Sequence, residues 1–277
     1  MFKSESFGEK FLELHLPFLC EIHHCYPRAI PDPNRFCILI HTAEPSLLKW
    51  DPLEVRQYHS NFDLILTSEK KLLDLYNTKF LIFGDSWVKK QPEKKVFSIS
   101  YLHSVGIRQP WNGYELRKDI WKSRFNIDAN IPLSFWYSSR RPPDLLDINS
   151  RDKIFDSENK DIIFESMFSI VIENISEYDY FSEKIVDCFA TMTIPIYFGC
   201  INISEYFDVT GIIIINCLDD LKKILEKLTI DDYYKKINTI IKNYLISKKY
   251  WDGKSRIKEA ILEKYISNNE NKIRYEI

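Results

Sequence analysis

The chain has 277 residues, of which 45% are hydrophobic and 14% aromatic, enough apolar material for the cores of one large or two modest domains. Its 38 basic and 40 acidic side chains give a formal net charge of −2, which excludes a general nucleic-acid binder, because such a protein needs a basic face. No apolar run approaches the roughly 20 residues that span a bilayer, and acids interrupt the N-terminal apolar stretch, unlike a signal peptide. The composition therefore predicts a soluble protein without a transmembrane segment.

The cysteines are scattered at positions 20, 25, 37, 188, 200 and 217. This scatter is typical of reduced, buried thiols in a cytoplasmic protein rather than of a disulfide framework. Cys20, His23, His24 and Cys25 suggest a zinc cluster, but no second pair completes a site at the usual spacing. The sequence therefore favours a packed N-terminal helix over a metal centre.

The first part of the chain alternates predicted helices and strands. After a helix over residues 9–20 comes a segment punctuated by prolines. Strands are then predicted at 36–41, 62–67 and 79–83, with helical stretches at 53–58 and 69–76 between them. This alternation predicts a small parallel sheet covered by helices.

A polar, charged linker over residues 85–95 separates a second β/α series. The predicted elements of that series are strands at 96–102, 133–137, 168–172, 194–198 and 211–216, and helices at 114–125, 182–192, 218–228, 231–247 and 254–267. Residues 138–157 read as loop. The sequence thus predicts an N-terminal domain over 1–93 and a C-terminal domain over 94–277 that includes the last helices.

Residues 168–198 have the pattern of a βαβ unit. The first strand ends in Glu173 and Asn174, Ser182 is a suitable helix N-cap, and Pro195 follows the end of the helix. In such a unit ligands bind beyond the carboxyl ends of the strands, facing the N-terminus of the crossover helix. Glu173, Asn174 and residues 180–184 are expected at that place.

Lys184 breaks a local rule, because a cation in the first turn of a helix opposes the macrodipole. A bound anion would compensate, and free backbone N–H groups beside an ammonium make a phosphate site. The alternative is that Lys184 pairs with Glu183 or Asp187 on a solvated face. Spacing alone leaves both readings open.

The run over residues 172–200 resembles the donor-binding motif of glycosyltransferase family 10, the α-1,3/1,4-fucosyltransferases. The family pattern is a strand ending in Glu-Asn, a loop, then Tyr-(Val/Phe)-(Thr/Ser)-Glu-Lys, a helix, and a Pro-Ile/Val-Tyr/Val-x-Gly strand. Here it is matched by Glu173-Asn174, by residues 180–184 and by residues 195–199. The resemblance implies an α/β, GT-B-like fold: two Rossmann-like domains facing a central cleft, the first on the acceptor side and the second binding the donor.

The same resemblance implies an inverting fucosyltransferase that moves fucose from GDP-fucose to a hydroxyl of a glycan or glycoconjugate acceptor. The chain resembles the soluble bacterial or viral members of the family. This implies that the protein is located in the cytoplasm of a bacterial cell or of an infected host. A transferase using another sugar nucleotide, and an inert sugar- or nucleotide-binding protein, are the alternatives. No Asp-x-Asp tripeptide occurs, so protein cations are expected to hold the diphosphate and no metal cofactor is expected.

Arg117 is the second predicted diphosphate ligand. It lies at the start of a predicted helix and resembles the family's diphosphate-binding arginine, although a surface pair with Glu115 or Asp119 is the alternative. The other predicted donor-binding residues are Glu173, Asn174, Tyr180, Glu183 and Lys184.

The general base is predicted in the first domain. Glu44 follows the strand at 36–41, and the carboxyl end of a parallel strand is where a catalytic group would face a ligand. The resemblance implies a glutamate base in a comparable position, but the glycine that precedes it in the family is Ala43 here. His41 is the rival, since its ordinary pKa is near neutral.

Overall fold

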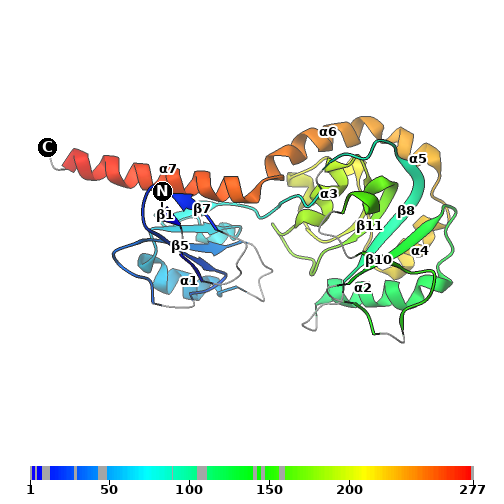
Figure 1. The fold of residues 1–277 in the computed structure, drawn as a ribbon, viewed down its shortest axis with the longest axis horizontal. Coiled ribbons are helices and arrows are strands. Elements are labelled where there is room, and N and C mark those ends of the chain that lie inside the picture. Colours follow the sequence, from blue (N-terminus) through cyan, green and yellow to red (C-terminus); the bar gives the residue numbers. More distant parts are fainter. Residues whose placement is uncertain are drawn as a thin grey trace. The chain divides into compact units, whose positions relative to one another are not determined.

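The computed structural model describes residues 2–3, 5–7, 13–27, 30–42, 49–88, 90–104, 111–139, 142–144, 147–155 and 160–275. The chain forms two compact units, Met1–Phe83 with Asp252–Ile277, and Gly84–Trp251 (Figure 1). The sequence predicts a boundary ten residues later, after residue 93, and the last helix in the second domain. The structure instead returns that helix to the first unit. A cleft between the units stays a prediction.

The first unit is built on a five-stranded parallel sheet whose strands follow one another in chain order. Its strands are β2 (Glu5–Phe7), β4 (Cys20–His24), β5 (Phe36–His41), β6 (Leu64–Thr67) and β7 (Thr78–Phe80). A separate antiparallel pair joins β1 (Phe2–Lys3) and β3 (His15–Leu16). The predicted strand at 36–41 is confirmed with its bounds.

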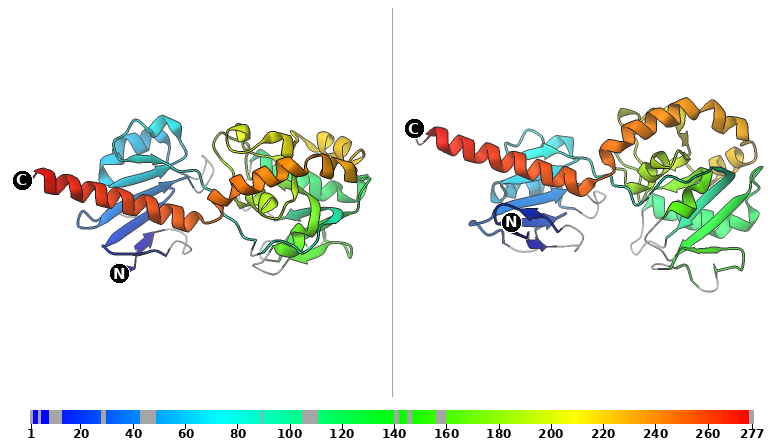
Figure 2. Two further views of the ribbon diagram at one scale, coloured as in Figure 1. Left: turned by 90° about the horizontal axis from the view of Figure 1, so that it is seen from above. Right: turned by 45° about the horizontal axis from the view of Figure 1, so that its top comes forward.

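Helices cover both faces of this sheet. On one face Val55 of α1 (Pro52–Tyr58) packs with Leu39 and Ile65. Along the other runs α7 (Gly253–Tyr275), as Figure 2 shows, and its residues Ile257 and Ile261 join the core. The sequence predicted a helix at 254–267, but the spacing of apolar residues along a helix does not show which sheet the helix covers.

Two predicted helices of the first unit are wrong. The described part of the 9–20 segment holds β3 and the start of β4, because Leu14, Leu16, Phe18 and Cys20 are buried in strict alternation with more exposed neighbours, which is the period of a strand. The helix predicted at 69–76 is reduced to a single 3₁₀ turn, Lys70–Leu72.

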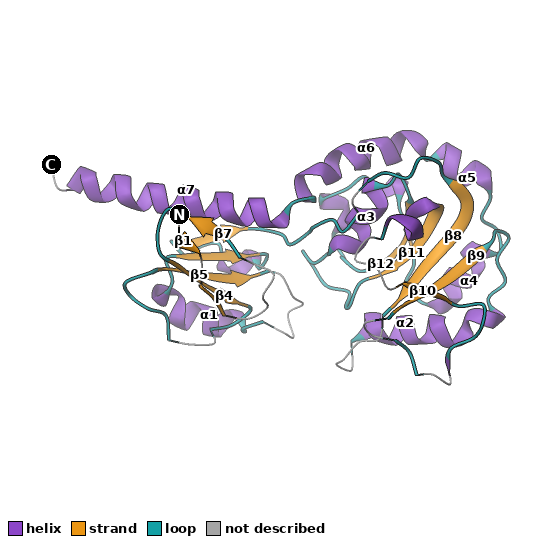
Figure 3. Ribbon diagram, in the orientation of Figure 1, coloured by secondary structure: helices purple, strands orange, loops and turns teal. Residues whose placement is uncertain are grey.

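The described residues of the second unit form six parallel strands in the order β10-β9-β8-β11-β12-β13. Figure 3 labels β8 to β12 of this sheet. The strands of the sheet are β8 (Val96–His103), β9 (Leu133–Ser138), β10 (Lys153–Phe155), β11 (Ser166–Ile172), β12 (Ile194–Phe198) and β13 (Ile213–Ile214). This is the strand order of a doubly wound nucleotide-binding sheet, and it reverses between β8 and β11. The short edge strand β10 lies in the stretch that was predicted to be loop.

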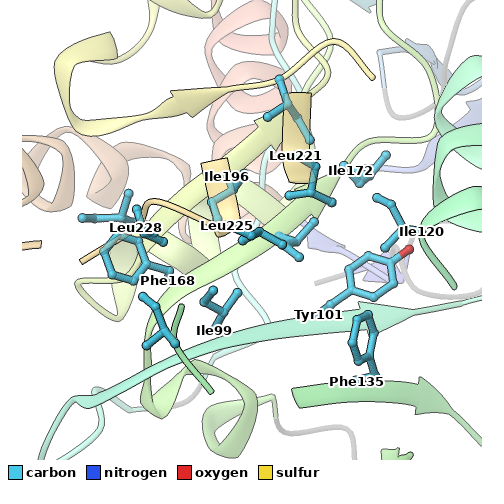
Figure 4. Packing of buried hydrophobic residues seen from close by; sticks show 14 of the residues in the cluster. Ile99, Tyr101, Ile120, Phe135, Phe168, Ile172, Ile196, Leu221, Leu225 and Leu228 are labelled. Atoms are coloured by element: carbon cyan, nitrogen blue, oxygen red, sulfur yellow. The ribbon is translucent and has the colours of Figure 1, made fainter. Parts of the chain in front are cut away.

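One large hydrophobic cluster of the second unit lies on one face of this sheet. Figure 4 shows Tyr101 and Ile172 from neighbouring strands directed toward Ile120, Leu221 and other apolar side chains. The helices that contribute to this core include α2 (Asn112–Ser123) and α4 (Leu218–Leu225). The crossover helix α3 (Glu183–Ala190) packs on β11 and β12, and α5 (Ile230–Lys235) and α6 (Ile237–Ser247) follow.

Candidate functional site

A cavity of about 270 Å³ opens in the second unit beside the ends of β8 and β11. Ligands of parallel sheets bind outside the carboxyl ends of the strands, where the strand order reverses. Its lining includes Arg117 from α2, Asn174 after β11, and Glu183 and Lys184 from α3, together with Lys160. Four of the six predicted donor-binding residues therefore meet at one place.

Gly113 allows α2 to begin against the end of β11. A Cβ on Gly113 would lie 2.0 Å from the carbonyl oxygen of Glu173 and 2.5 Å from that of Asn174, so no other residue fits without a backbone shift. This approach places Arg117, one turn further along α2, beside Asn174.

Arg117 is buried, with 6% of its surface exposed. Its Nε donates to the carbonyl oxygen of Ile172 at 2.9 Å, and its Nη2 donates to the same oxygen and to Asn174 Oδ1. Nη1 has no hydrogen-bond partner among the described residues. This geometry contradicts a surface pair with Glu115 or Asp119, and it leaves one edge of the guanidinium for a ligand.

Glu173 ties the start of α3 to the end of β11. It is fully buried, and its two carboxylate oxygens accept hydrogen bonds from the backbone N–H of Ser182 at 2.9 Å and from the Ser182 hydroxyl at 2.6 Å. Ser182 is the N-cap of α3, as predicted. Glu173 lies outside the cavity lining and orients α3, and Tyr180 is also buried outside that lining.

Lys184 lies at the rim with 26% of its side chain exposed. Its Nζ donates to Ser182 Oγ at 2.8 Å and to Glu173 Oε2 at 3.4 Å, and it lies 3.6 Å from Glu183 Oε1. Two carboxylates thus compensate the cation that opposes the helix dipole. The pairing with Glu183 that the sequence left open is present, but in the wall of a cavity.

Lys160 lines the candidate cavity although nothing in the sequence predicted it there. It is 4% exposed, and its Nζ lies 3.1 Å from both Glu183 Oε1 and Asp187 Oδ2 and 4.4 Å from the centroid of the Trp87 ring. Burial alone would lower the pKa of Lys160, but the two carboxylates raise it to about 12. Burial likewise opposes ionisation of Glu183, yet Lys184 and Lys160 hold its pKa well below the usual range.

In the first unit the predicted base Glu44 lies outside the described residues. Its rival His41 is fully buried. His41 Nε2 donates to the carbonyl oxygen of Trp50 at 2.7 Å, so Nδ1 is the acceptor facing Thr67 Oγ1 at 3.0 Å. Burial lowers the pKa of His41 to about 4 despite the bond to Trp50. His41 is therefore held as a neutral structural group, with no nitrogen open to a substrate.

Strand β4 separates the residues of the suggested zinc cluster, since His23 follows the alternation of the strand and points away from Ile22 and His24. Across the described residues no group of histidine, cysteine, aspartate and glutamate side chains is arranged to hold a metal ion. None of the described helices has the length and apolarity needed to cross a membrane.

No model of a known protein family and no curated protein matches the sequence. Solved structures do match. One match is the crystal structure of an α1,3-fucosyltransferase with GDP, with a TM-score of 0.50 and 13% identity. The match covers 78% of this chain and 68% of the fucosyltransferase chain. The fold is GT-B-like, as predicted.

Two further matches are an α1,3-fucosyltransferase with GDP-fucose (TM-score 0.49, 15% identity, 79% of this chain and 68% of the other) and the pneumococcal O-GlcNAc transferase GtfA in complex with UDP and GlcNAc (TM-score 0.45, 10% identity, 84% and 53%). At these identities the likeness concerns the fold.

Proposed function

We propose that this chain is a glycosyltransferase that takes a nucleoside diphosphate sugar as its donor. One observation carries the proposal: Arg117 and Lys184 both line a cavity at the reversal point of a parallel sheet, and Lys184 lies in the first turn of α3. A helix N-terminus and preorganised cations suit a departing diphosphate, whose charge grows in the transition state. We assign its oxygens to Arg117 Nη1 and to the Lys184 ammonium.

The remaining residues take roles that follow from their exposure. Asn174 and Glu183 line the cavity and are assigned to ribose or sugar hydroxyls. Glu173 and Tyr180 are buried, so we assign them to support of the loop and of α3. With cations in these places the reaction needs no metal cofactor.

The donor we propose is GDP-fucose, and the acceptor a hydroxyl of a glycan or glycoconjugate. The support is the family 10 motif over residues 172–200, together with a fold shared with an α1,3-fucosyltransferase. We propose inversion through a single in-line displacement, with Glu44 as the base that removes the acceptor proton.

A panel of nucleotides and sugar nucleotides tests the proposal. Thermal unfolding is measured with GDP, UDP and CMP, and nucleotide release from GDP-fucose, GDP-mannose and UDP-GlcNAc is measured with and without EDTA. We expect stabilisation by GDP alone and GDP release from GDP-fucose that survives EDTA. Stabilisation by UDP rather than GDP would mean that the donor is another sugar nucleotide. GDP binding without nucleotide release would mean that the chain is a binding protein. Loss of nucleotide release in EDTA that manganese restores would contradict a metal-free reaction.

A further inference from the structure

We propose that Lys160 is a positioning residue of the donor cavity, which fixes the carboxylate of Glu183 in the orientation that meets the donor; the inference rests on the proposed function. Lys160 precedes the 3₁₀ turn Asp161–Glu165, which leads into β11. Glu183 and Asp187 lie one turn apart on α3, and the Lys160 ammonium lies 3.1 Å from an oxygen of each. One cation therefore holds two carboxylates of the same helix.

Without this cation the arrangement would be unfavourable. Carboxylates four residues apart on a helix repel each other, and here the side chain of Asp187 is fully buried and that of Glu183 is 12% exposed. Each would oppose ionisation of the other in a poorly solvated place. Burial opposes ionisation of both groups and still raises the pKa of Asp187, but Lys184 and Lys160 hold the pKa of Glu183 well below its usual range, so Glu183 stays ionised.

Contacts on the side of Asp187 away from Glu183 fix the position of Lys160. Asp187 Oδ1 accepts hydrogen bonds from Ser86 Oγ at 2.9 Å and from the backbone N–H of Trp87 at 2.8 Å, while Asp187 Oδ2 faces Lys160. The Trp87 ring lies against the ammonium. A rigid chain of contacts thus runs from residues 86–87 through Asp187 and Lys160 to Glu183.

This chain ends in the cavity that we assign to the donor. A carboxylate that binds sugar hydroxyls must be ionised and held in one rotamer, because small displacements of positioning groups reduce turnover. A negative charge next to a diphosphate is also unfavourable unless it is compensated. Lys160 also lines this cavity, and we assign it to orienting and compensating Glu183 rather than to a donor contact.

The first test is a double-mutant cycle that joins Lys160→Met and Glu183→Gln, with GDP release from GDP-fucose in water as the readout. Lys160→Met should lower kcat by about ten- to a hundred-fold, and should lower it by less than about threefold in the Glu183→Gln background, because its effect passes through Glu183. Lys160→Arg should restore part of the loss, since a guanidinium also reaches two carboxylates. Lys227→Met, an exposed lysine of the same unit, is the control and should match wild type.

Lys160→Met leaves two buried carboxylates without their shared cation, which destabilises the fold. A second comparison therefore uses Asp187→Asn and Lys160→Met/Asp187→Asn, which removes one charge of each sign. The fall in kcat should reappear between these two variants. The proposed role of Lys160 would be overturned if Asp187→Asn and Lys160→Met/Asp187→Asn had equal kcat. It would also be overturned if Lys160→Met lowered kcat by the same factor with and without Glu183→Gln. If the wild-type protein releases nucleotide from no sugar nucleotide, the proposed function fails first and the inference falls with it.

Discussion

Arg117 and Lys184, which both line the cavity, differ in how the protein already binds their charged groups. Two of the three guanidinium nitrogens of Arg117 are already bound to Ile172 and Asn174, so the third is presented in a fixed direction. Lys184 is bound to Ser182 and Glu173, so an anion must compete for it. A diphosphate bound as we propose would therefore meet one cation held in a fixed direction and one that must exchange its partners.

Replacing either cation should slow transfer strongly. Arg117→Ala and Lys184→Ala should each lower turnover about a hundred-fold, roughly 3 kcal/mol of transition-state stabilisation, as for loss of one preorganised donor. Steady-state kinetics with GDP-fucose measure this, with the exposed Lys227→Ala as the matched control. Near-normal turnover in both variants would place the diphosphate elsewhere.

The base assignment predicts a selective loss of transfer. Glu44→Gln preserves shape but removes basicity, so transfer to an acceptor should fall about a hundred-fold, while GDP binding, assigned to the second unit, should be unchanged. Calorimetric titration with GDP beside a transfer assay checks both. Glu44→Gln with full transfer activity would refute the assignment.

His41→Gln is expected to behave differently from Glu44→Gln. It breaks the paired contacts of a buried ring with Thr67 and Trp50, and should therefore lower the thermal stability of the protein. Transfer by the fraction that stays folded should be retained. A selective loss of transfer at unchanged stability would make His41 the base after all.

Which site residues could be predicted depends on how local their signal is. Ser182, Glu183 and Lys184 belong to one helix start, where capping and the helix dipole constrain the sequence. Lys160 lies 23 residues from Glu183, in a segment without periodicity, so its role exists only in the folded chain. The burial of Glu173 could not be predicted either, because a polar residue at a strand end faces a ligand or a helix N-terminus equally well.

At the scale of elements, the central strands were readable and the edges were not. β5 and β12 are buried, β-branched runs with the predicted bounds. β10 has three residues and pairs on one side only, too little for a pattern. Leu14 and Phe18 are four residues apart and so fit a helix, whereas Leu16 between them fits a strand. The segment forms strands because β3 pairs with β1 and β4 pairs with β5, and such pairing partners cannot be read from the local sequence.

Lys95, directly before β8, makes the free energy of unfolding depend on pH. Lys95 donates from Nζ to the carbonyl oxygen of Phe164 and to Thr193 Oγ1, each at 2.6 Å, and burial lowers its pKa from 10.5 to about 7. Below pH 7 the native state must bury the charged ammonium. Between pH 7 and 10.5 the unfolded chain binds more protons than the native one, so the free energy of unfolding gains a contribution that rises with pH.

Lys95→Met should therefore stabilise the protein more at low pH than at high pH. Urea unfolding of both proteins at about pH 6 and about pH 9.5 measures the difference, which should shrink as the pH rises. A difference that is the same at both values would contradict a lowered pKa.

At the scale of the whole molecule, the buried residues of α7 and the candidate cavity belong to different units. Ile261 of α7 is fully buried in the first unit, while every residue lining the candidate cavity belongs to the second. Ile261→Ala should lower the free energy of unfolding by about 2–5 kcal/mol and leave the affinity for GDP unchanged. Ile266→Ala, at a 54% exposed position, should change stability by less than about 0.5 kcal/mol. Urea unfolding and GDP titration separate the two effects.

Gly84 and Tyr250 bring the two ends of the second unit together. A Cβ on Gly84, whose φ is +113°, would lie 3.3 Å from the Tyr250 Cβ, so the chain enters and leaves this unit at neighbouring points and the unit is an insertion within the first. During synthesis the ribosome must therefore complete the inserted unit before it makes α7. The unit that is begun first is finished last, the reverse of the usual order. Until α7 is made, the apolar sheet face that Ile257 and Ile261 will cover stays uncovered by that helix.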